Sequence, residues 1–181
     1  MELKAVHLHD TVGLMQTLGL LDWPSLWVGL ERGWVWADDL IAFSTQWLLE
    51  HPDEDNEHIT LLAGGESLDE AELRDMLGNH LREVSGETPD PRAAPEVDKW
   101  RLAALCLLDQ SDLPPDEKLD ALEELRAEFD YPEDMRACSR YYVPPQFAGR
   151  QFAVGEHLPW EDPFEAVQAV IAKLRKQFGV S

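Results

Sequence analysis

The motif HLHD near the start of the chain contains His7, His9 and Asp10, three residues of types that bind metal ions. Residues two positions apart do not share a face of a helix, although they do share a face of a β-strand. The rest of the sequence offers no second cluster with metal-ligand spacing, and a metal site needs its full set of ligands. We therefore interpret these histidines as surface or capping residues, and we expect no metal ion and no other cofactor.

Catalytic motifs are equally scarce. Gly64-Gly65 precedes a predicted helix, as a phosphate-binding loop would, but no lysine follows at the required spacing and the next residues are acidic. The sequence contains no GxSxG or HExxH motif and no convincing pair of cysteine and histidine. Carboxylates are so numerous that some must lie close together, which leaves an acid–base pair open without nominating one. We expect that the protein is not an enzyme.

Charge is the strongest global property of the sequence. It has 36 acidic residues and 15 basic ones, which is a formal net charge of -21. Such a surface repels nucleic acids and anionic membranes, and it accelerates the approach of basic proteins at low salt. The sequence therefore predicts a basic protein partner, without direct binding to nucleic acid or to a membrane. The alternative interpretation is that the charge serves solubility alone.

Two acidic blocks concentrate this charge. Glu50 to Asp90 contains 13 acidic residues and two basic ones, and Asp109 to Asp134 contains 11 and two. Several of these residues fall on the polar faces of predicted amphipathic helices, which form either a solvated surface or a surface complementary to a basic partner. The candidate partner-binding residues are Asp53, Glu54, Asp55, Glu57, Glu66, Asp69, Glu70, Asp116, Glu117, Asp120, Glu123 and Glu124. We expect the first four to be exposed.

Helix-terminal residues mark several predicted helices in the N-terminal half. Pro24 suits the first turn of a short helix, and Gly33 suits its C-terminal end. Asp38 and Asp39 suit the first turn of the next helix, which should stop near Pro52. These signals place two apolar helices one after the other.

The later part of the chain continues in the same way. Ser67 and Glu70 have the spacing of a capping box, and further helices are predicted over 96–110, from Pro114-Pro115 onward, and over 163–178. Alternating patterns typical of strands are scarce. The predicted fold is all-α, a single irregular bundle of seven to nine helices. It forms one domain over residues 1–181, with a flexible loop at 85–95.

Seven tryptophans are many for 181 residues, and five of them crowd one quarter of the chain. A helix–helix core is the favoured interpretation, because buried aromatic side chains contribute large apolar areas. Trp36, at a predicted helix entry, is the best candidate for an exposed anchor at a protein interface. The sequence leaves open whether Trp36, Tyr141 and Tyr142 belong to the core or to an interface.

The two cysteines and the N-terminus bear on the compartment. Cys106 lies in an apolar run and is expected to be buried, and neither Cys106 nor Cys138 has metal-ligand spacing. The N-terminus lacks the layout of a signal peptide, and the longest apolar run is far shorter than a membrane span. We expect reduced thiols in a cytoplasmic protein.

The stretch AEFDYPEDMRACSRYYVPP, residues 127–145, follows an acidic helical segment and contains two arginines, three tyrosines and three prolines. Tyr131 precedes Pro132, which ends the first helix and allows a second one to begin. Arg136 and Arg140 are four residues apart and are expected to share a face and to pair with the acidic segment. We therefore predict a joint that attaches the C-terminal part to the acidic helices, rather than a ligand site.

This last stretch also carries a resemblance. The segments GLERGWVWADDLIAFS, residues 29–44, and LDALEELRAEFDYPEDMRACSRYYVPP, residues 119–145, together with the helix around Trp100, resemble a family of small bacterial proteins. We associate that family with immunity proteins of polymorphic toxin and contact-dependent inhibition systems. The most specific part is FDYPEDM with the following RYY. The proline-rich insert at 88–95 and the stretch AGRQFAVGEHLPWEDP depart from the family pattern.

The resemblance implies a cytoplasmic immunity protein. The sequence leaves the oligomeric state open, and we favour a monomer. Its partner would be a cognate toxin domain, expected to be a basic nuclease, and the acidic helices would stand in for nucleic-acid phosphates. The resemblance brings no catalytic residue with it. The alternative function is a helical adaptor or regulatory module that binds another cellular protein. Genetic context separates the two, because an immunity protein should be encoded beside its toxin.

Overall fold

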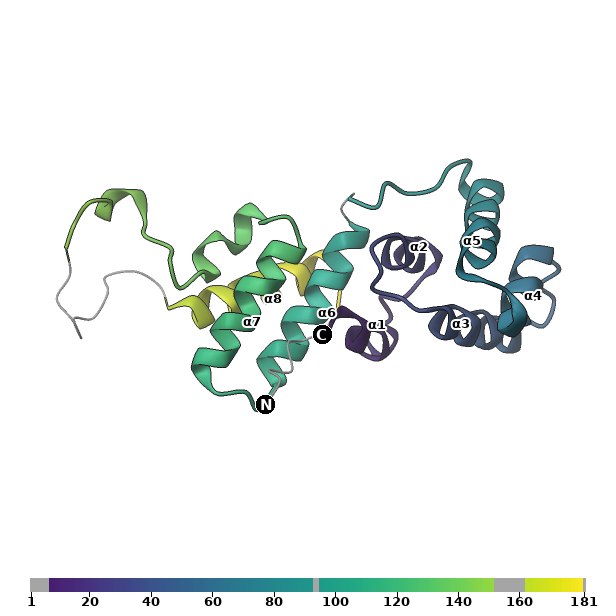
Figure 1. Ribbon diagram of the computed structural model, residues 1–181, viewed down its shortest axis with the longest axis horizontal. Coiled ribbons are helices and arrows are strands. Elements are labelled where there is room, and N and C mark those ends of the chain that lie inside the picture. Colours follow the sequence, from purple (N-terminus) through teal and green to yellow (C-terminus); the bar gives the residue numbers. More distant parts are fainter. Residues whose placement is uncertain (1–6, 93–94, 152–161, 181) are drawn as a thin grey trace. The chain divides into compact units, whose positions relative to one another are not determined.

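The computed structural model describes residues 7–92, 95–151 and 162–180, with only the backbone of Glu66. Within these ranges the chain forms eight α-helices and four short 3-10 helices, and no strand (Figure 1). The predicted all-α class is confirmed, and the number of α-helices lies in the predicted range of seven to nine. Across the same ranges, no helix combines the length and the apolar character needed to cross a membrane.

The chain divides into two compact units, with the boundary between Ala103 and Ala104. The first unit is His7–Ala103, and the second contains Ala104–Ser181. The boundary falls within one helix, α6 (Glu96–Gln110), which contributes residues to both units. Whether these two units together form the single domain predicted for residues 1–181 stays a prediction.

The first unit contains the helices before α6. They are η1 (Leu8–Thr11), α1 (Val12–Thr17), α2 (Trp23–Glu31), α3 (Ala37–Glu50), α4 (Glu57–Ala63), η2 (Gly65–Ser67) and α5 (Glu70–Ser85). At the starts of α2, α4 and α5, local side chains accept hydrogen bonds from the free backbone N–H groups. The Asp22 carboxylate accepts a hydrogen bond from the Ser25 N–H at 2.9 Å, and the Asn56 side chain caps α4.

The capping box at the start of α5 lies two residues later than predicted. Asp69 accepts from the Glu72 N–H at 2.9 Å, and the Glu72 carboxylate accepts from the Asp69 N–H at 2.9 Å. The prediction of Ser67 and Glu70 is wrong because Ser67 belongs to the 3-10 helix η2. Aspartate caps as well as serine does, so two overlapping candidates existed and the preceding turn selected the second.

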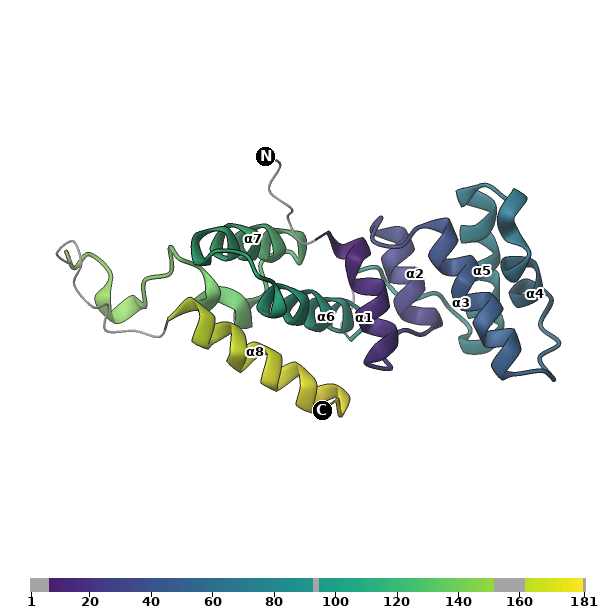
Figure 2. The same ribbon diagram turned by 90° about the horizontal axis from the view of Figure 1, so that it is seen from below.

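The core of the first unit forms where its helices meet. Figures 1 and 2 show α3, α4 and α5 side by side, and α2 packs against α5. Trp100, from the first part of α6, is fully buried, and its indole N–H donates to the Ser25 carbonyl oxygen at 2.9 Å. Gly29 on α2 faces the Trp100 ring closely enough that no side chain fits between them. The first unit therefore has a tightly packed core of aromatic and aliphatic side chains.

The tryptophans divide between core and surface. Trp23 and Trp34 are buried, as the helix-core interpretation predicts, and Trp27 is half-buried. Trp36 is 60% exposed, and its ring stacks on the His9 imidazole with the ring centres 3.5 Å apart. Trp36 therefore lies on the surface, where the sequence had left its position open.

The connection from α5 to α6 contains the loop predicted at 85–95. Gly86 ends α5 with a φ of 84°, a left-handed conformation that glycine adopts without strain. The Trp27 indole N–H donates to the Pro89 carbonyl oxygen at 3.0 Å, which attaches this part of the loop to α2. Residues 93–94 lie outside the described residues, and the flexibility of the loop stays a prediction.

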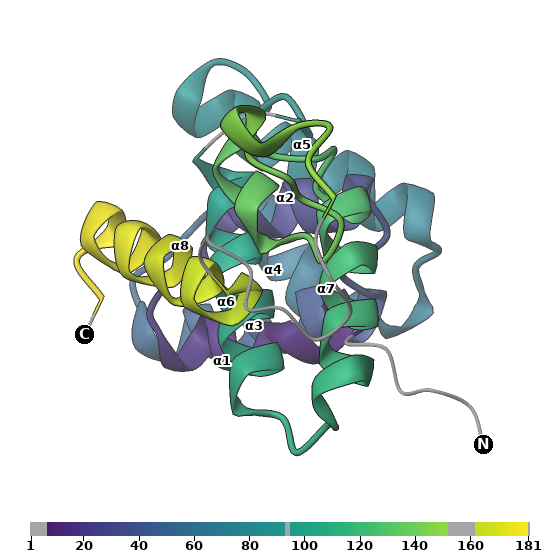
Figure 3. The ribbon, with the colours of Figure 1, turned by 90° about the vertical axis from the view of Figure 1, so that its left-hand side faces the viewer.

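The second unit contains the remainder of α6 and the elements that follow it. They are α7 (Pro115–Glu128), η3 (Glu133–Cys138), η4 (Pro145–Phe147) and α8 (Pro163–Phe178). Figures 2 and 3 show α8 beside α6, where Gln168 donates to the Asp109 carboxylate, and α8 also packs on η3. Cys106 and Cys138 are buried free thiols, so the predicted burial of Cys106 is confirmed.

Candidate functional site

The first group of candidate acids surrounds the connection from α3 to α4. Asp53, Asp55 and Glu57 are exposed, and no side chain in the described ranges pairs with them. Glu54 differs from these three acids, since it is half-buried. Its carboxylate accepts hydrogen bonds from the Trp47 indole N–H at 3.2 Å and from the Asn56 N–H at 3.0 Å. These hydrogen bonds, the Trp47 one foremost, lower the pKa of Glu54. The expectation that all four acids are exposed is therefore wrong for Glu54.

A cluster of histidines lies behind this connection. The His58 ring and the Asn56 amide both contact the Glu83 carboxylate, at 3.1 Å each, and join the start of α4 to the end of α5. His80 is buried, and its ring lies edge-on to Trp23 with the ring centres 5.0 Å apart. Sequence reasoning missed this cluster, although the acidic block between Glu50 and Asp90 contains every one of its histidines.

Burial lowers the pKa of His80 below its ordinary value of 6.5, since an imidazolium is poorly solvated there. The negative charges of Glu54 and Glu83 oppose this shift, and the charge of His58 adds to it. In the folded protein His80 therefore stays neutral at a pH where the unfolded chain already binds a proton.

We expect the protein to lose stability as the pH falls through 6.5 towards the lower pKa of folded His80. Above 6.5 both states are neutral at this position, so His80 contributes no slope. The measurement is the free energy of unfolding by urea at several pH values between about 7.5 and 5, a window that stays above the titration of Glu54. His80→Phe, which keeps a ring against Trp23, should flatten the slope. If the free energy of unfolding of this variant depends on pH as steeply as that of the unchanged protein, groups other than His80 cause the pH dependence.

The candidate acids at the start of α5 are engaged in local structure. Asp69 is the cap of α5, and Glu70 accepts from Arg74 at 2.9 Å. The Arg74 guanidinium also pairs with Glu31 of α2 at 2.8 Å. The side chain of Glu66, a further candidate, lies outside the described residues. At this end of α5 the carboxylates stabilise the helix and its contact with α2.

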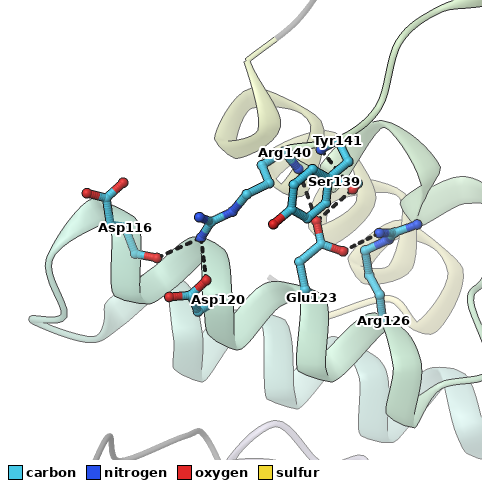
Figure 4. A network of polar contacts seen from close by, with 7 residues as sticks. All are labelled: Asp116, Asp120, Glu123, Arg126, Ser139, Arg140 and Tyr141. Atoms are coloured by element: carbon cyan, nitrogen blue, oxygen red, sulfur yellow. Dashed lines mark hydrogen bonds and ion pairs between the residues drawn. The ribbon is translucent and has the colours of Figure 1, made fainter.

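In the second unit the acids of α7 hold the segment that follows it (Figure 4). Glu123 accepts from the Ser139 hydroxyl at 2.6 Å and from the Arg140 N–H at 3.1 Å, and it also pairs with Arg126. The Arg140 guanidinium donates to the Asp120 carboxylate at 2.7 Å and to the Asp116 carbonyl oxygen at 2.9 Å. The predicted joint between α7 and the C-terminal part is confirmed.

The two arginines of this joint do not act together as predicted. The helix η3 ends at Cys138, so Arg140 lies beyond it in extended chain, and the spacing of four residues does not place the arginines on one helical face. Arg136 pairs with Glu133 of its own turn at 3.3 Å, whereas Arg140 reaches α7. The prediction that the two arginines share a helical face is wrong, because the helix here is a 3-10 helix of six residues that ends before Arg140.

The turn at the end of α7 is a second feature that the sequence did not predict. Tyr131 N–H donates to the Arg126 carbonyl oxygen at 2.7 Å, and Asp130 N–H donates to the Ala127 carbonyl oxygen at 3.1 Å. This is the hydrogen-bond pattern of a Schellman motif, with Asp130 where glycine is usual. Asp130 and Tyr131 have φ values of 59° and 54°, which cost about 1–2 kcal/mol each. The strained turn leaves Tyr131 65% exposed.

Next to this turn is a polar pocket of about 330 Å³ between η3 and the chain that follows it. Tyr141, 76% exposed, stands at its edge, and Arg126 and Arg136 line it. Both arginines already pair with carboxylates, and the Ser139 hydroxyl donates to the Glu123 carboxylate. The Arg126 Nε, by contrast, is buried without a hydrogen-bond partner. The pocket provides contact surface, since tyrosine and arginine are common at interface centres.

The motif HLHD has a structural role at His9. The His9 ring pairs with the Asp39 carboxylate at 3.1 Å, and Asp39 also accepts from the Trp36 N–H at 3.0 Å. His7 and Asp10 are exposed. Among the described residues, no three histidine, cysteine or acidic side chains gather as a metal ion would require.

The structure thus sorts the candidate acids by what their carboxylates contact. Glu54, Asp69, Glu70, Asp120 and Glu123 bond to other parts of the protein. Within the described ranges, the carboxylates without a partner are those of Asp53, Asp55, Glu57, Asp116, Glu117 and Glu124. The sequence could not make this distinction for Asp120 and Glu123, because their partners Ser139 and Arg140 lie far away along the chain, whereas the contacts of Asp69 and Glu70 are local.

Comparison with known proteins places the chain in a family. No curated protein and no solved structure matches it. The sequence model of one bacterial family, described as "uncharacterized protein conserved in bacteria", matches residues 15–176. This match covers most of the chain, including both acidic blocks and the joint after α7. The chain therefore belongs to the DUF2247 family of conserved bacterial proteins.

Proposed function

We propose that this protein is an immunity protein that binds a cognate bacterial toxin domain and neutralises it. The partner is a basic protein, expected to be a nuclease, whose substrate groove is complementary to the acidic helices. This protein acts by blocking the active site or the substrate groove of the toxin and carries out no reaction itself. Support for the immunity role comes from the resemblance in residues 29–44 and 119–145 to families associated with toxin systems.

The observation that carries the proposal is the set of carboxylates without a partner in the described ranges. Asp53, Asp55 and Glu57 form one group in the first unit, and Asp116, Glu117 and Glu124 lie on α7 in the second. Glu57, Asp116 and Glu117 lie in the first turns of α4 and α7, where the helix dipole favours a negative charge. Asp53, Asp55 and Glu124 lack this stabilisation and add repulsion to a chain of net charge -21. A basic partner would offset this repulsion on binding, and the charges would steer its approach.

The experiment is capture of the protein encoded in the reading frame beside this gene. The present protein is immobilised, the neighbouring product is passed over it, and the bound material is eluted with rising salt. We expect a basic protein that elutes at high salt, is toxic to cells without this protein, and is inactive in the complex. A neighbouring product that does not bind, or binds without being toxic, would overturn the immunity proposal and favour a helical adaptor.

Charge reversal tests which surface steers the partner. In the triple variant Asp53→Lys, Asp55→Lys, Glu57→Lys, association with the neighbour-encoded protein should slow by about tenfold at low salt, with a flatter salt dependence. The measurement is the association rate by surface plasmon resonance at several salt concentrations. The control reverses Asp10, Asp75 and Glu87, which are exposed, lie outside both proposed contact surfaces and change the net charge equally. An unchanged association rate would contradict the steering hypothesis. Equal slowing by the test variant and the control variant would show that Asp53, Asp55 and Glu57 have no special role in steering.

A further inference from the structure

A second cavity lies in the second unit, where the end of α6, the start of α7 and the start of α8 meet. Its volume is about 290 Å³. Its apolar lining consists of Leu108, Leu113, Pro115, Leu122, Phe164 and Val167. This volume is just below the range for small-molecule sites, about 300–1,000 Å³, and gives room for one large side chain.

The floor and the wall of this cavity differ in burial. Leu108, Leu122 and Val167 are buried core residues and form the floor. Leu113 and Phe164 are half-buried and Pro115 is exposed, so they form the wall at the surface. An apolar group that enters the cavity therefore meets the core of the unit directly, and burying it there is favourable.

The polar groups of the cavity already have partners. The Lys118 ammonium donates to the Asp109 carbonyl oxygen at 2.9 Å, and the Asp109 carboxylate accepts from Gln168. A polar ligand would have to displace these bonds, and a polar group buried without a partner is costly. The occupant that suits the interior is therefore apolar.

The surroundings of the cavity are acidic. Asp112, Asp116 and Glu165 are exposed, and each is next in sequence to a wall residue. Asp162, two positions before Phe164, is also exposed, and its carboxylate caps α8 by accepting from the Phe164 N–H at 2.8 Å. Lys118 is the one base among the residues that line the cavity, and its ammonium is engaged with a backbone carbonyl. An apolar centre with an acidic rim is complementary to an apolar side chain that is flanked by lysine or arginine.

We propose that this cavity receives an apolar anchor residue of the basic partner, with lysine or arginine on either side of it contacting the acidic rim. The inference rests on the proposed function and adds to it the place where the partner is held. Steering by free carboxylates governs how fast the partner arrives, whereas an anchor in a desolvated cavity governs how slowly it leaves.

The first test uses the protein alone with three short probes. They are the capped tripeptides Arg-Trp-Arg and Glu-Trp-Glu and the neutral N-acetyl-tryptophanamide, titrated into protein with labelled leucine and valine methyl groups. We expect saturable NMR shifts of Leu108, Leu113 and Val167 with the basic peptide, at an affinity at least about fivefold above that of the neutral probe. The acidic peptide should bind least.

Each other outcome of this titration overturns the proposal. Shifts elsewhere, or no shifts, would exclude the cavity as the anchor site. Equal shifts with all three probes would show an apolar ligand site that does not distinguish charge, such as a site for a small apolar molecule. Because no toxin is needed, failure here leaves the capture experiment on the neighbouring gene product unaffected.

The second test uses the captured partner and a pair of matched variants. Leu113→Asn alters the cavity wall, and Leu49→Asn makes the same change on the first unit, where Leu49 is 73% exposed. We expect the dissociation rate of the partner to rise at least about tenfold for Leu113→Asn, with its association rate unchanged, and neither rate to change for Leu49→Asn. If Leu113→Asn does not fold, Phe164→Ala replaces it. An unchanged dissociation rate in a folded wall variant would overturn the proposal.

Discussion

Gly29→Ala should destabilise the first unit more than any other substitution of a single methyl group in it. A Cβ atom at Gly29 would lie 2.5 Å from the Trp100 ring and 2.5 Å from a methyl group of Val35. Both neighbours are buried, Trp100 fully, and neither is the end of a flexible side chain. Overpacking of this kind costs about 3 kcal/mol, and the better helix propensity of alanine returns about 1 kcal/mol. The expected net loss is about 2 kcal/mol.

The control for this prediction is the same substitution at Gly13. Gly13 is on α1, is exposed, and has no atom within 4 Å of an added Cβ. Gly13→Ala should therefore leave the protein as stable as before or raise its stability by up to about 1 kcal/mol. Urea unfolding measures both variants, with the midpoint and the slope fitted separately. If the two variants unfold at the same urea concentration, the close contact between α2 and Trp100 is not present in solution.

Glu123→Ala is the second prediction with a large effect. The Glu123 carboxylate accepts hydrogen bonds from Ser139 and Arg140 and pairs with Arg126, whose side chain is only 12% exposed. Removing it leaves a mostly buried guanidinium without its partner and releases the joint after α7. Because Glu123 is itself partly exposed, we expect a loss of about 2 kcal/mol rather than the 3–5 kcal/mol typical of a fully buried pair. Chymotrypsin should also cut faster at Tyr141 and Tyr142.

Two control variants, Glu124→Ala and Glu123→Gln, test whether the Glu123 carboxylate stabilises the fold. Glu124→Ala changes the next residue, which is exposed and has no partner in the described ranges, and should alter stability by no more than about 0.5 kcal/mol. Glu123→Gln keeps an acceptor for Ser139 but loses the charge, and its stability should lie between the two. Thermal unfolding provides the comparison. If Glu123→Ala is as stable as Glu124→Ala, the contacts of the Glu123 carboxylate do not stabilise the fold.

Local sequence signals predicted most of the helices because their causes are local. Helices α6 and α8 have the predicted bounds, and α2 begins next to Pro24 and ends before Gly33. Periodicity, proline at the first turn and glycine after the last turn act within a few residues, so they can be read without knowing the fold. Where two local signals overlapped, as at Ser67 and Asp69, the turn formed by η2 decided between them.

The candidate surface depended on contacts between distant residues, which no local pattern reveals. Glu123 and Glu124 are adjacent and identical in type, yet one meets Ser139 and Arg140 and the other faces solvent. The apolar cavity likewise needs α6, α7 and α8 together, because each of them contributes only part of its lining.

By itself, the sequence determined that the protein is helical, strongly acidic and rich in tryptophan, because composition and short-range periodicity are properties of the chain. Only the tertiary structure decided which acids are free to meet a partner. It also placed Trp36 outside and Trp34 inside, although both are tryptophans at neighbouring positions. The physical reason is that pairing and burial depend on which side chains are brought together from distant helices, and that is a property of the packed fold.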